Sequence, residues 1–346
     1  MRTLVTGHTG YIGTILCEQL LQAGHEVFGI DSGFFEDCIF GGTIPDVPSI
    51  RLDIRDIQLA DLQGVDAVIH LAALSNDVLG NLDANLTSEI NHRATIRLGT
   101  LAKQAGISRF LFSSSCSSYG ASDRTALTED AELRPVTPYG KSKVQSEIGL
   151  HALASESFSP TMLRNATAYG FSPRLRLDLV VNGLVGEALT TGELLLQSDG
   201  TPWRPLVHVD DIAHAFVAVL HAPRHNIHDQ TFNIGRTEEN YQIRDIAEII
   251  SSMIPRTRIR YAEGAGPDSR CYRVDCSRVN RQVPDFRPRW TLRKGIMELL
   301  SAYQEHGLDH SAIASHAFHR ITRIQGLMNT GRLSRDLRWS EALYCS

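Results

Sequence analysis

A tyrosine and a lysine stand four residues apart in the segment Thr137-Pro-Tyr-Gly-Lys-Ser-Lys143, at Tyr139 and Lys143. On a helix this spacing places both side chains on one face, about one turn apart. A phenol normally titrates near pH ~10, and a neighbouring ammonium group favours its ionised form. The pair could therefore work as a general base. The same pattern is also compatible with a solvent-facing helix that has no catalytic role.

Hydroxyl side chains follow a short apolar segment upstream of this pair. Residues 109–112 are expected to form a strand, and a run of serines that includes Ser115 comes directly after it. In a parallel sheet, catalytic groups lie just beyond the carboxyl ends of the strands. A hydroxyl from this run could therefore hydrogen-bond the substrate oxygen that Tyr139 deprotonates. The alternative is a serine-rich loop without chemistry.

A glycine-rich turn near the amino terminus predicts a dinucleotide site. The expected strand 2–6 leads into Gly7-His-Thr-Gly10-Tyr-Ile-Gly13, and residues 14–23 favour a helix. Glycines let the backbone approach a pyrophosphate, which then lies at the helix N-terminus. The next expected strand, 26–30, ends at Asp31, where a carboxylate bonds a ribose 2′-hydroxyl and repels a 2′-phosphate. This pattern favours NAD over NADP, and a structural aspartate beside a glycine turn is the alternative.

Strands and helices alternate through the first half of the chain. Residues 65–73 form a near-continuous apolar run, as buried parallel strands do, and His70 within it is best explained as a core histidine. Helices are expected over 86–105 and 141–154, with the strand 109–112 between them. This alternation predicts an α/β fold built on a doubly wound parallel Rossmann sheet.

A short strand that ends in acidic residues is expected after the loop that follows Asp31. Residues 32–49 are expected to form a loop, and residues 50–56 a short strand that carries Asp53. At the carboxyl edge of the sheet, Asp53 is placed to meet an adenine amino group.

A further strand is expected over 161–165, and the composition changes after residue 170. The elements predicted beyond that point are the strands 193–197 and 231–235 and the helices 178–191, 212–221 and 241–255. Asp210 or Asp211 is expected to cap the helix 212–221. We expect an NAD-binding Rossmann domain over 1–165, with strands returning near 205–235, and a smaller, interleaved substrate-binding domain mainly over 166–346. The sequence assigns no role to the tail after about residue 305, and a lid and a dimer element are both open.

Composition excludes several classes of protein. The chain has 346 residues, 42% of them hydrophobic and 21% charged, which is enough for a sizeable core. A net charge of −5 without a Lys/Arg cluster argues against a nucleic-acid partner. The fourteen histidines lack a metal-ligand spacing, so no metal is expected. Six cysteines without a C-x-x-C pair, no signal peptide and no membrane-length apolar run indicate a cytoplasmic protein with no membrane partner.

Taken in order, the motifs resemble the extended short-chain dehydrogenase/reductase family, in its nucleotide-sugar epimerase/dehydratase branch. The resemblance covers residue 1 to about residue 300. It rests on TGHTGYIG at 6–13, Asp31, LDI at 52–54, HLAA at 70–73, SSSCSSYG at 113–120, PYGKSK at 138–143, RPLVHVDDI at 204–212 and FNIG at 232–235. It implies a bound NAD, a substrate that is a nucleotide sugar or related nucleoside, and a homodimer in which the helices 86–105 and 141–154 pair with their copies.

The resemblance also implies roles for individual residues. Tyr139 is the base, Lys143 binds the nicotinamide ribose and lowers the Tyr139 pKa, and Ser115 completes the catalytic set. The implied cofactor-binding residues are Gly7, Gly10, Tyr11, Ile12, Gly13, Asp31, Asp53, Ile54, Leu71, Ala72, Ala73, Asn91, Ser113, Tyr139 and Lys143. The implied substrate-binding residues are Ser75, Ser115, Thr167, Asn182, Arg204 and Arg270. For Arg204 the alternative is a structural ion pair with a nearby acid.

Two departures from the family pattern bear on the reaction. Dehydratases of this branch carry an Asp-Glu pair directly after the catalytic hydroxyl, where this chain has Cys116 and Ser117. We interpret Cys116 as a packing residue. Epimerases of the branch place a phosphate-binding asparagine where this chain has Thr167.

We therefore expect an NAD-dependent nucleotide-sugar epimerase that works through a transient keto intermediate. Tyr139 takes a hydroxyl proton, NAD accepts the hydride, and the hydride returns to the opposite face of the sugar. The first alternative is a dehydratase or oxidoreductase acting on a modified nucleotide sugar or nucleoside. The second is a non-catalytic NAD-binding protein, which the presence of both Tyr139 and Lys143 disfavours.

Overall fold

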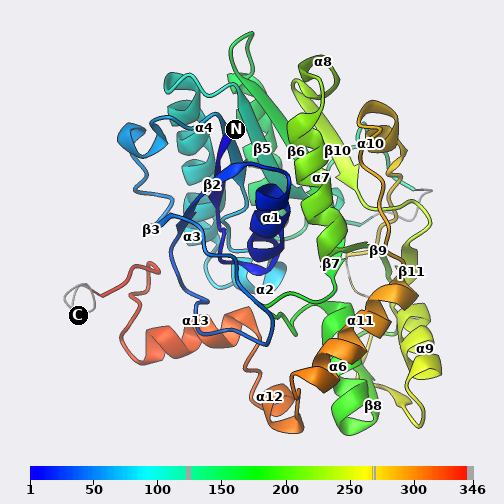
Figure 1. Ribbon diagram of the computed structural model, residues 1–346. Coiled ribbons are helices and arrows are strands. Elements are labelled where there is room, and N and C mark those ends of the chain that lie inside the picture. Colours follow the sequence, from blue (N-terminus) through cyan, green and yellow to red (C-terminus); the bar gives the residue numbers. More distant parts are fainter. Residues whose placement is uncertain (122–125, 267, 269, 341–346) are drawn as a thin grey trace.

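A seven-stranded parallel sheet organises the molecule (Figure 1). The computed structural model describes residues 1–121, 126–266, 268 and 270–340. The strand order is β10-β6-β5-β4-β1-β2-β3, and every neighbouring pair is parallel. Its strands are β1 (Arg2–Thr6), β2 (Glu26–Asp31), β3 (Ser49–Arg51), β4 (Ala67–His70), β5 (Arg109–Ser115), β6 (Ser159–Asn165) and β10 (Gln230–Ile234). The order runs outward from β1 in both directions, which confirms the predicted doubly wound fold and opens a crevice at the carboxyl ends of the strands.

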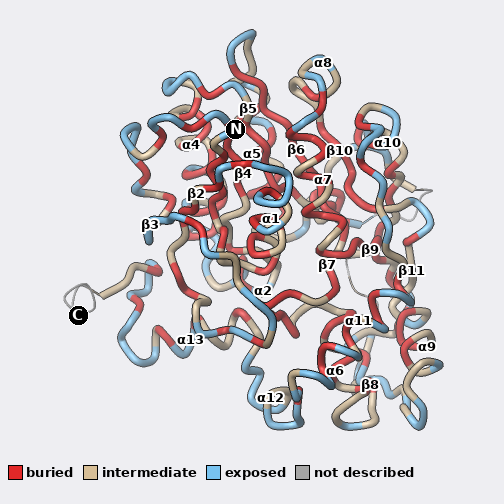
Figure 2. The backbone as a smooth tube through the Cα atoms, viewed as in Figure 1, coloured by how far each residue is buried: buried red, intermediate tan, exposed pale blue. Residues whose placement is uncertain are grey.

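Both faces of the sheet are covered, so its strands are apolar on both sides. The helices α1 (Tyr11–Gln22) and α7 (Val209–His221) share one apolar cluster with inward residues of β1, β5 and β10. On the other face α4 (Ala94–Gln104) and α5 (Pro138–Leu153) share a second cluster. Figure 2 shows the buried residues concentrated in these strands and in the helix faces turned toward them. His70 is 1% exposed and bonds Thr6 and Thr95, as expected for a core histidine.

The helix that carries the tyrosine–lysine pair has a well-defined start. Thr137 is the N-cap, and its hydroxyl accepts a hydrogen bond from the Gly140 backbone N–H at 3.1 Å. Pro138 occupies the first helical position, where its missing N–H removes no hydrogen bond. The predicted helix 141–154 is therefore confirmed but begins three residues earlier, so Tyr139 lies in its first turn.

The predicted helix 86–105 is present but is not uniform. It divides into α3 (Ala84–Thr87), a π-helical stretch η2 (Ser88–Arg93) and α4. The π-helical geometry places Asn91 where its side chain bonds the N–H of Leu74 at 2.8 Å and the carbonyl of Leu74 at 3.1 Å. This local departure from α-helical geometry has no periodicity signal in the sequence, and it ties the helix to the loop after β4.

The second half of the chain forms a separate layer beside the carboxyl edge of the sheet. Its sheets have the orders β11-β9-β7 and β12-β8. The strands are β7 (Thr167–Tyr169), β8 (Glu193–Leu196), β9 (Trp203–His208), β11 (Asn240–Gln242) and β12 (Arg258–Tyr261). The helices of this layer are α6 (Val180–Thr191), α9 (Ile243–Met253), α11 (Leu292–Glu305) and α12 (His310–Ala314). Two further helices of the second half, α8 (Arg224–Ile227) and α10 (Ser277–Gln282), pack against β10 of the main sheet. A third apolar cluster joins α6, α9 and α11.

The expected cap of helix α7 was wrong. His208 is the N-cap, and its ring accepts a hydrogen bond from the Asp210 N–H at 3.2 Å. Asp211 lies in the first turn and accepts hydrogen bonds from the backbone N–H groups of Arg289 and Trp290. The helix begins three residues earlier than predicted because its cap is a histidine, a residue type that is uncommon at this position.

The end of the chain returns to the first half of the molecule. Helix α13 (Arg320–Asn329) buries Ile324 and Leu327 in the apolar cluster on the α4 and α5 face of the sheet. Residues 330–340 continue along β2 and β3, as Figure 1 shows for the red segment beside the blue strands. No helix within the described ranges is long and apolar enough to cross a membrane.

Candidate active site

A cavity of about 950 Å³ lies along the carboxyl edge of the sheet. Its walls come from the turn between β1 and α1, the ends of β2, β4, β5 and β6, the start of α5, the loop before α6, and the tail. This volume is at the upper end of the ~300–1,000 Å³ typical of small-molecule sites. The cavity is therefore large enough for a cofactor and a substrate together.

The glycine turn presents bare backbone to one end of this cavity. Gly7 has φ of +76°, and a Cβ there would lie 2.8 Å from the backbone nitrogen of Ala72. No other residue fits at this position without displacing the backbone. Asp31, at the end of β2, accepts hydrogen bonds from the N–H groups of Thr9 at 3.2 Å and Gly33 at 2.8 Å, and it lines the cavity. This combination fits the pyrophosphate and ribose of a dinucleotide.

Opposite the glycine turn, the tyrosine, the lysine and the serine come together at the other end of the cavity. Ser115 is the last residue of β5, and its hydroxyl accepts hydrogen bonds from the Ser117 hydroxyl at 2.8 Å and the Ser117 N–H at 3.2 Å. It is also close enough to Tyr139 to lower the pKa of the phenol. Lys143 Nζ donates to the Ser113 carbonyl at 2.7 Å and lies 5.7 Å from the centre of the Tyr139 ring. The three side chains approach the cavity from β5 and α5, which pack directly against each other.

Burial controls the protonation of this group. It raises the pKa of Tyr139 to about 12, while the hydrogen bond from Ser115 acts in the opposite direction. It also lowers the pKa of Lys143 to about 7, against the attraction of Glu147. Desolvation of the phenolate outweighs the opposing effects of Ser115 and Arg176 on the Tyr139 pKa. The lowering expected from Lys143 stays a prediction.

Comparison with known proteins identifies the family. The model of the NAD-dependent epimerase/dehydratase family matches residues 3–235. The chain belongs to this family. Its cofactor is accordingly NAD, and the glycine turn and Asp31 are the residues that fit it.

Relatives within the family carry out more than one reaction. A UDP-glucose 4-epimerase of Mycolicibacterium smegmatis is 29% identical, over 88% of this chain and 99% of its own length. A dTDP-glucose 4,6-dehydratase of Streptomyces griseus is 27% identical, over 88% and 94%. The solved structure of MoeE5 with UDP-glucuronic acid and NAD has a TM-score of 0.77 at 27% identity, over 88% of this chain and 99% of its own.

The structure brings nearly all of the predicted site residues to the cavity wall. Those that line it are Gly7, Gly10, Tyr11, Ile12, Gly13, Asp31, Asp53, Ile54, Leu71, Ala72, Ala73, Ser75, Ser113, Ser115, Tyr139, Lys143, Thr167, Arg204 and Arg270. Their individual roles stay predictions.

Two predicted binding residues, Asn91 and Asn182, are not part of the cavity wall, and their binding roles stay predictions. Asn91 is 1% exposed, and its amide bonds both backbone groups of Leu74 and the hydroxyl of Ser142. Asn182 is 0% exposed, and its amide bonds both backbone groups of Gly170 and the carbonyl of Arg176. Both amides hydrogen-bond loops that border the cavity, so they fix the positions of these loops.

Three charged residues predicted to bind ligands already have protein partners. Asp53 forms an ion pair of 2.6 Å with Arg55. Arg204 bonds Asp268 at 2.8 Å, which is the ion-pair alternative considered for it, and still lines the cavity. Arg270 bonds the same carboxylate of Asp268. Arg204, Asp268 and Arg270 therefore form a connected network of charges on one wall of the cavity.

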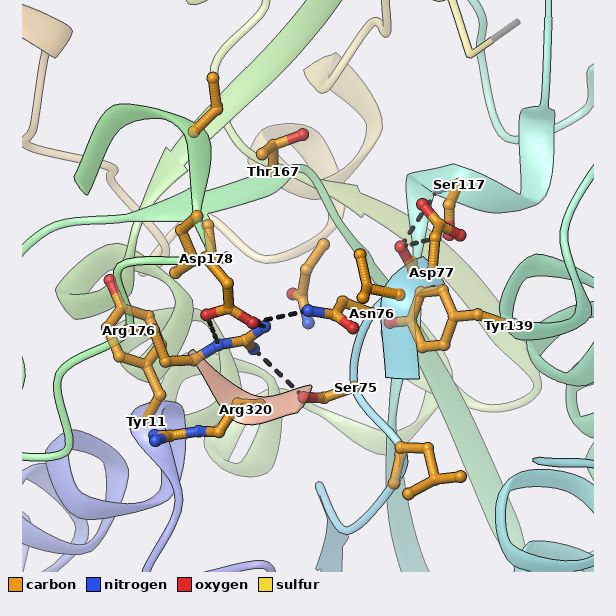
Figure 3. Close-up of a pocket in the computed structure, with 18 of the residues that line it drawn as sticks. Tyr11, Ser75, Asn76, Asp77, Ser117, Tyr139, Thr167, Arg176, Asp178 and Arg320 are labelled. Carbon is orange, nitrogen blue, oxygen red and sulfur yellow. Dashed lines mark hydrogen bonds and ion pairs between the residues drawn. The ribbon is translucent and has the colours of Figure 1, made fainter. Parts of the chain in front are cut away.

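The sequence reasoning missed a second set of polar residues at the cavity, which Figure 3 shows. Arg176 forms two hydrogen bonds of 2.9 Å with Asp178 and one of 3.1 Å with Ser75. Asp77 accepts from the Thr137 hydroxyl at 2.6 Å, and its other oxygen accepts from Arg270 at 2.6 Å. The close spacing of Arg174, Arg176 and Asp178 could have suggested a charged loop. No feature of the sequence pointed to Arg320, which lines the cavity from the tail.

Proposed function

We propose that this protein is an NAD-dependent epimerase that inverts a hydroxyl-bearing carbon of a nucleotide sugar. The observation that carries the proposal is the convergence of Ser115, Tyr139 and Lys143 on one cavity whose neighbouring wall fits NAD. That arrangement supplies a base, a hydrogen-bonding hydroxyl and a cation beside a hydride acceptor. Epimerisation requires these groups and no further acid or base.

Each residue has a defined task in this reaction. Tyr139 takes the proton of the sugar hydroxyl as the carbon is oxidised and returns it after reduction. Ser115 hydrogen-bonds the same oxygen and holds it near the phenol. Lys143 supplies positive charge and, through the Ser113 carbonyl, is fixed to the end of β5. NAD, when bound, accepts the hydride and returns it, and its cationic ring favours the Tyr139 phenolate.

The residues after Ser115 support epimerisation over dehydration. Dehydratases of the family carry an Asp-Glu pair where this chain has Cys116 and Ser117. Cys116 is 0% exposed, and its thiol points to the carbonyl of Arg164 at 3.2 Å. Burial raises the pKa of this thiol well above its usual value, so it stays protonated and cannot act as a base.

A specific observation favours dehydration as the second candidate. Asp77 lines the cavity, and its charge is close enough to influence Tyr139. A carboxylate there could remove a proton from the carbon next to a keto group, which is the step that water elimination needs. In this structure both oxygens of Asp77 are engaged, by Thr137 and Arg270. This engagement favours a positioning role and keeps epimerisation as the leading proposal.

Product analysis separates the two functions. The protein with NAD bound is incubated with a panel of UDP-, dTDP- and GDP-linked hexoses, and the products are analysed by mass spectrometry and NMR. An epimerase gives a product of unchanged mass with one inverted centre, whereas a dehydratase gives a product lighter by one water with a keto group. Turnover of no nucleotide-linked sugar would contradict both.

We further propose that two copies associate through α4 and α5. These helices flank the strand that carries Ser115, and α5 presents Ile148, whose exposed fraction is 64%. The family resemblance assigns this surface to the dimer, and Ile148 gives it a large exposed apolar side chain whose replacement tests the assignment. Sedimentation at micromolar concentration is expected to show a dimer, and Ile148→Asp is expected to shift it toward monomer. A wild-type monomer would contradict this proposal.

A further inference from the structure

Three buried arginine side chains cluster at the glycine-turn end of the cavity. Arg174, Arg176 and Arg320 are 5%, 6% and 2% exposed. Arg174 and Arg176 come from the loop before α6, and Arg320 comes from the first turn of α13. Figure 3 shows Arg176 and Arg320 on the same side of the cavity as Tyr11 of the glycine turn, with Tyr139 on the opposite side.

The cluster has more arginine side chains than carboxylates that form ion pairs with them. Arg176 is fully engaged by the carboxylate of Asp178. No ion pair joins Arg174 or Arg320 to a carboxylate in the part of the chain that the structure describes. Burying an unpaired cation costs several kcal/mol, so such groups normally face a counter-ion.

Arg320 has free hydrogen-bonding capacity at the cavity. Its Nη2 donates to the carbonyl of Arg174 at 2.9 Å, and its guanidinium stacks 4.5 Å from the centre of the Phe35 ring. Its Nη1 is buried and has no partner. Burial and the charge of Arg176 lower the Arg320 pKa to about 10, so it stays cationic at neutral pH. A planar donor held in this way matches a phosphate oxygen.

The tail is anchored on both sides of Arg320, so its position is fixed. After α13, the Trp339 indole N–H donates to the carbonyl of Ser32 at 2.6 Å. Arg338 lies 3.2 Å from Asp53, which lines the cavity. Before α13, the Leu177 N–H donates to the carbonyl of Phe318 at 3.2 Å. The tail thus crosses the end of the cavity where Asp31 and Asp53 lie, which we call the adenosine end. We call residues 318–340 the C-terminal strap.

We propose that Arg320 binds the pyrophosphate of NAD, and that the C-terminal strap is part of the cofactor site. The glycine turn beside it is the pyrophosphate cradle expected of the family. The diphosphate of a nucleotide sugar is the other anion available, but the charges predicted for it, Arg204 and Arg270, come from a different wall of the cavity. The proposal rests on family membership and NAD binding, and it does not depend on which sugar is turned over.

Binding measurements on Arg320→Met test the proposal without turnover. Methionine keeps an apolar stem over Phe35 and removes every donor. By calorimetry we expect the affinities for NAD and ADP-ribose to fall about 10- to 100-fold, as expected for lost charged hydrogen bonds. The affinities for adenosine, which lacks phosphate, and for UDP, which reports the substrate end, are expected to stay unchanged.

Arg323→Met is the matched control. Arg323 lies on the same helix, bonds the carbonyl of Phe34 at 3.2 Å and pairs with Asp37, and is not part of the cavity wall. The substitution Arg323→Met removes the same charge from the same helix as Arg320→Met does. The NAD affinity of this control is expected to stay at the wild-type value. Equal losses in both variants would mean that α13 acts through its packing, which would overturn the proposal.

Other outcomes would also overturn it. Unchanged NAD affinity in Arg320→Met would exclude the pyrophosphate contact, and weaker UDP binding with normal NAD binding would assign the guanidinium to the substrate. An equal loss for adenosine and NAD would indicate collapse of the strap. If Arg320→Met does not fold, a crystal structure of the wild type with NAD decides: hydrogen-bonding distance between Arg320 Nη1 and a phosphate oxygen supports the proposal, and a wider separation overturns it.

Discussion

The two ends of the cavity are assembled in different ways. At the catalytic end, Ser115 and Tyr139 come from β5 and α5, neighbours in both sequence and space. At the phosphate end, Tyr11, Arg176 and Arg320 come from three segments spread over nearly the whole chain. The catalytic end therefore depends on local elements and a single packing contact. The phosphate end depends on the complete tertiary fold, because the glycine turn, the loop with Arg174 and Arg176, and α13 are far apart in sequence.

The largest effect is expected from Tyr139→Phe. Removing the hydroxyl abolishes proton transfer but leaves a ring of the same shape, so kcat is expected to fall about 100- to 10,000-fold. Steady-state kinetics on the best substrate of the panel measure this loss. Calorimetry is expected to show unchanged NAD affinity, since the phosphate end is untouched. Near-normal turnover would show that Tyr139 is not the base.

Asp31→Ala is expected to have the next largest effect, at the opposite end of the cavity. The variant loses a charged acceptor for ribose hydroxyls, so NAD affinity is expected to fall about 10- to 100-fold. NADP binding is expected to improve relative to NAD, because the charge that repels a 2′-phosphate is gone. Titration of both cofactors measures the ratio. Equal wild-type affinity for NAD and NADP would contradict the role given to Asp31.

Arg204→Lys tests the wall of the cavity that carries Arg204 and Arg270, which are predicted to bind the diphosphate of the substrate. A lysine keeps the charge but cannot reproduce planar, bidentate binding of a diphosphate, so KM is expected to rise about tenfold. NAD affinity is expected to stay at the wild-type value. Loss of folded protein, with an unchanged KM in the fraction that remains folded, would show that Arg204 serves only its ion pair with Asp268.

The smallest expected effect is a change in the pH dependence of stability in the cofactor-free protein. Burial lowers the pKa of Lys143 from 10.5 to about 7, so between these pH values the unfolded state binds more protons than the folded state. The contribution of Lys143 to the free energy of unfolding therefore rises with pH from about 7 to about 10. Urea unfolding across this pH range measures the free energy of unfolding. We expect it to rise less steeply with pH in Lys143→Met than in the wild type. Parallel profiles for the two proteins would mean that Lys143 is charged when folded.

The catalytic end could be predicted from the sequence because its signals are short and local. The four-residue spacing of Tyr139 and Lys143 has a physical reason that holds wherever the helix packs. The glycine turn was predictable for the same reason. Periodicity and turn chemistry also predicted the order of strands and helices in the main sheet.

The missed features depend on contacts between distant segments. Asn91 and Asn182 were placed in the cavity because their positions follow a family pattern, but their amides face neighbouring loops. The raised pKa of Tyr139 follows from burial, and burial is a property of the assembled fold. Arg320 lies in a helix with an ordinary sequence, and only its return across the chain gives it a place in the cavity.

The return of the tail also has a consequence for how the protein is made. Arg320, Arg338 and Trp339 leave the ribosome about 300 residues after the glycine turn, because they follow it in the chain by that distance. During synthesis the sheet and the catalytic end can form while the adenosine end is still open. A message truncated before the codon for Arg320 would therefore specify a protein with its base and glycine turn in place and one wall of its cofactor site missing. The cofactor site would thus become complete only after translation has passed this codon.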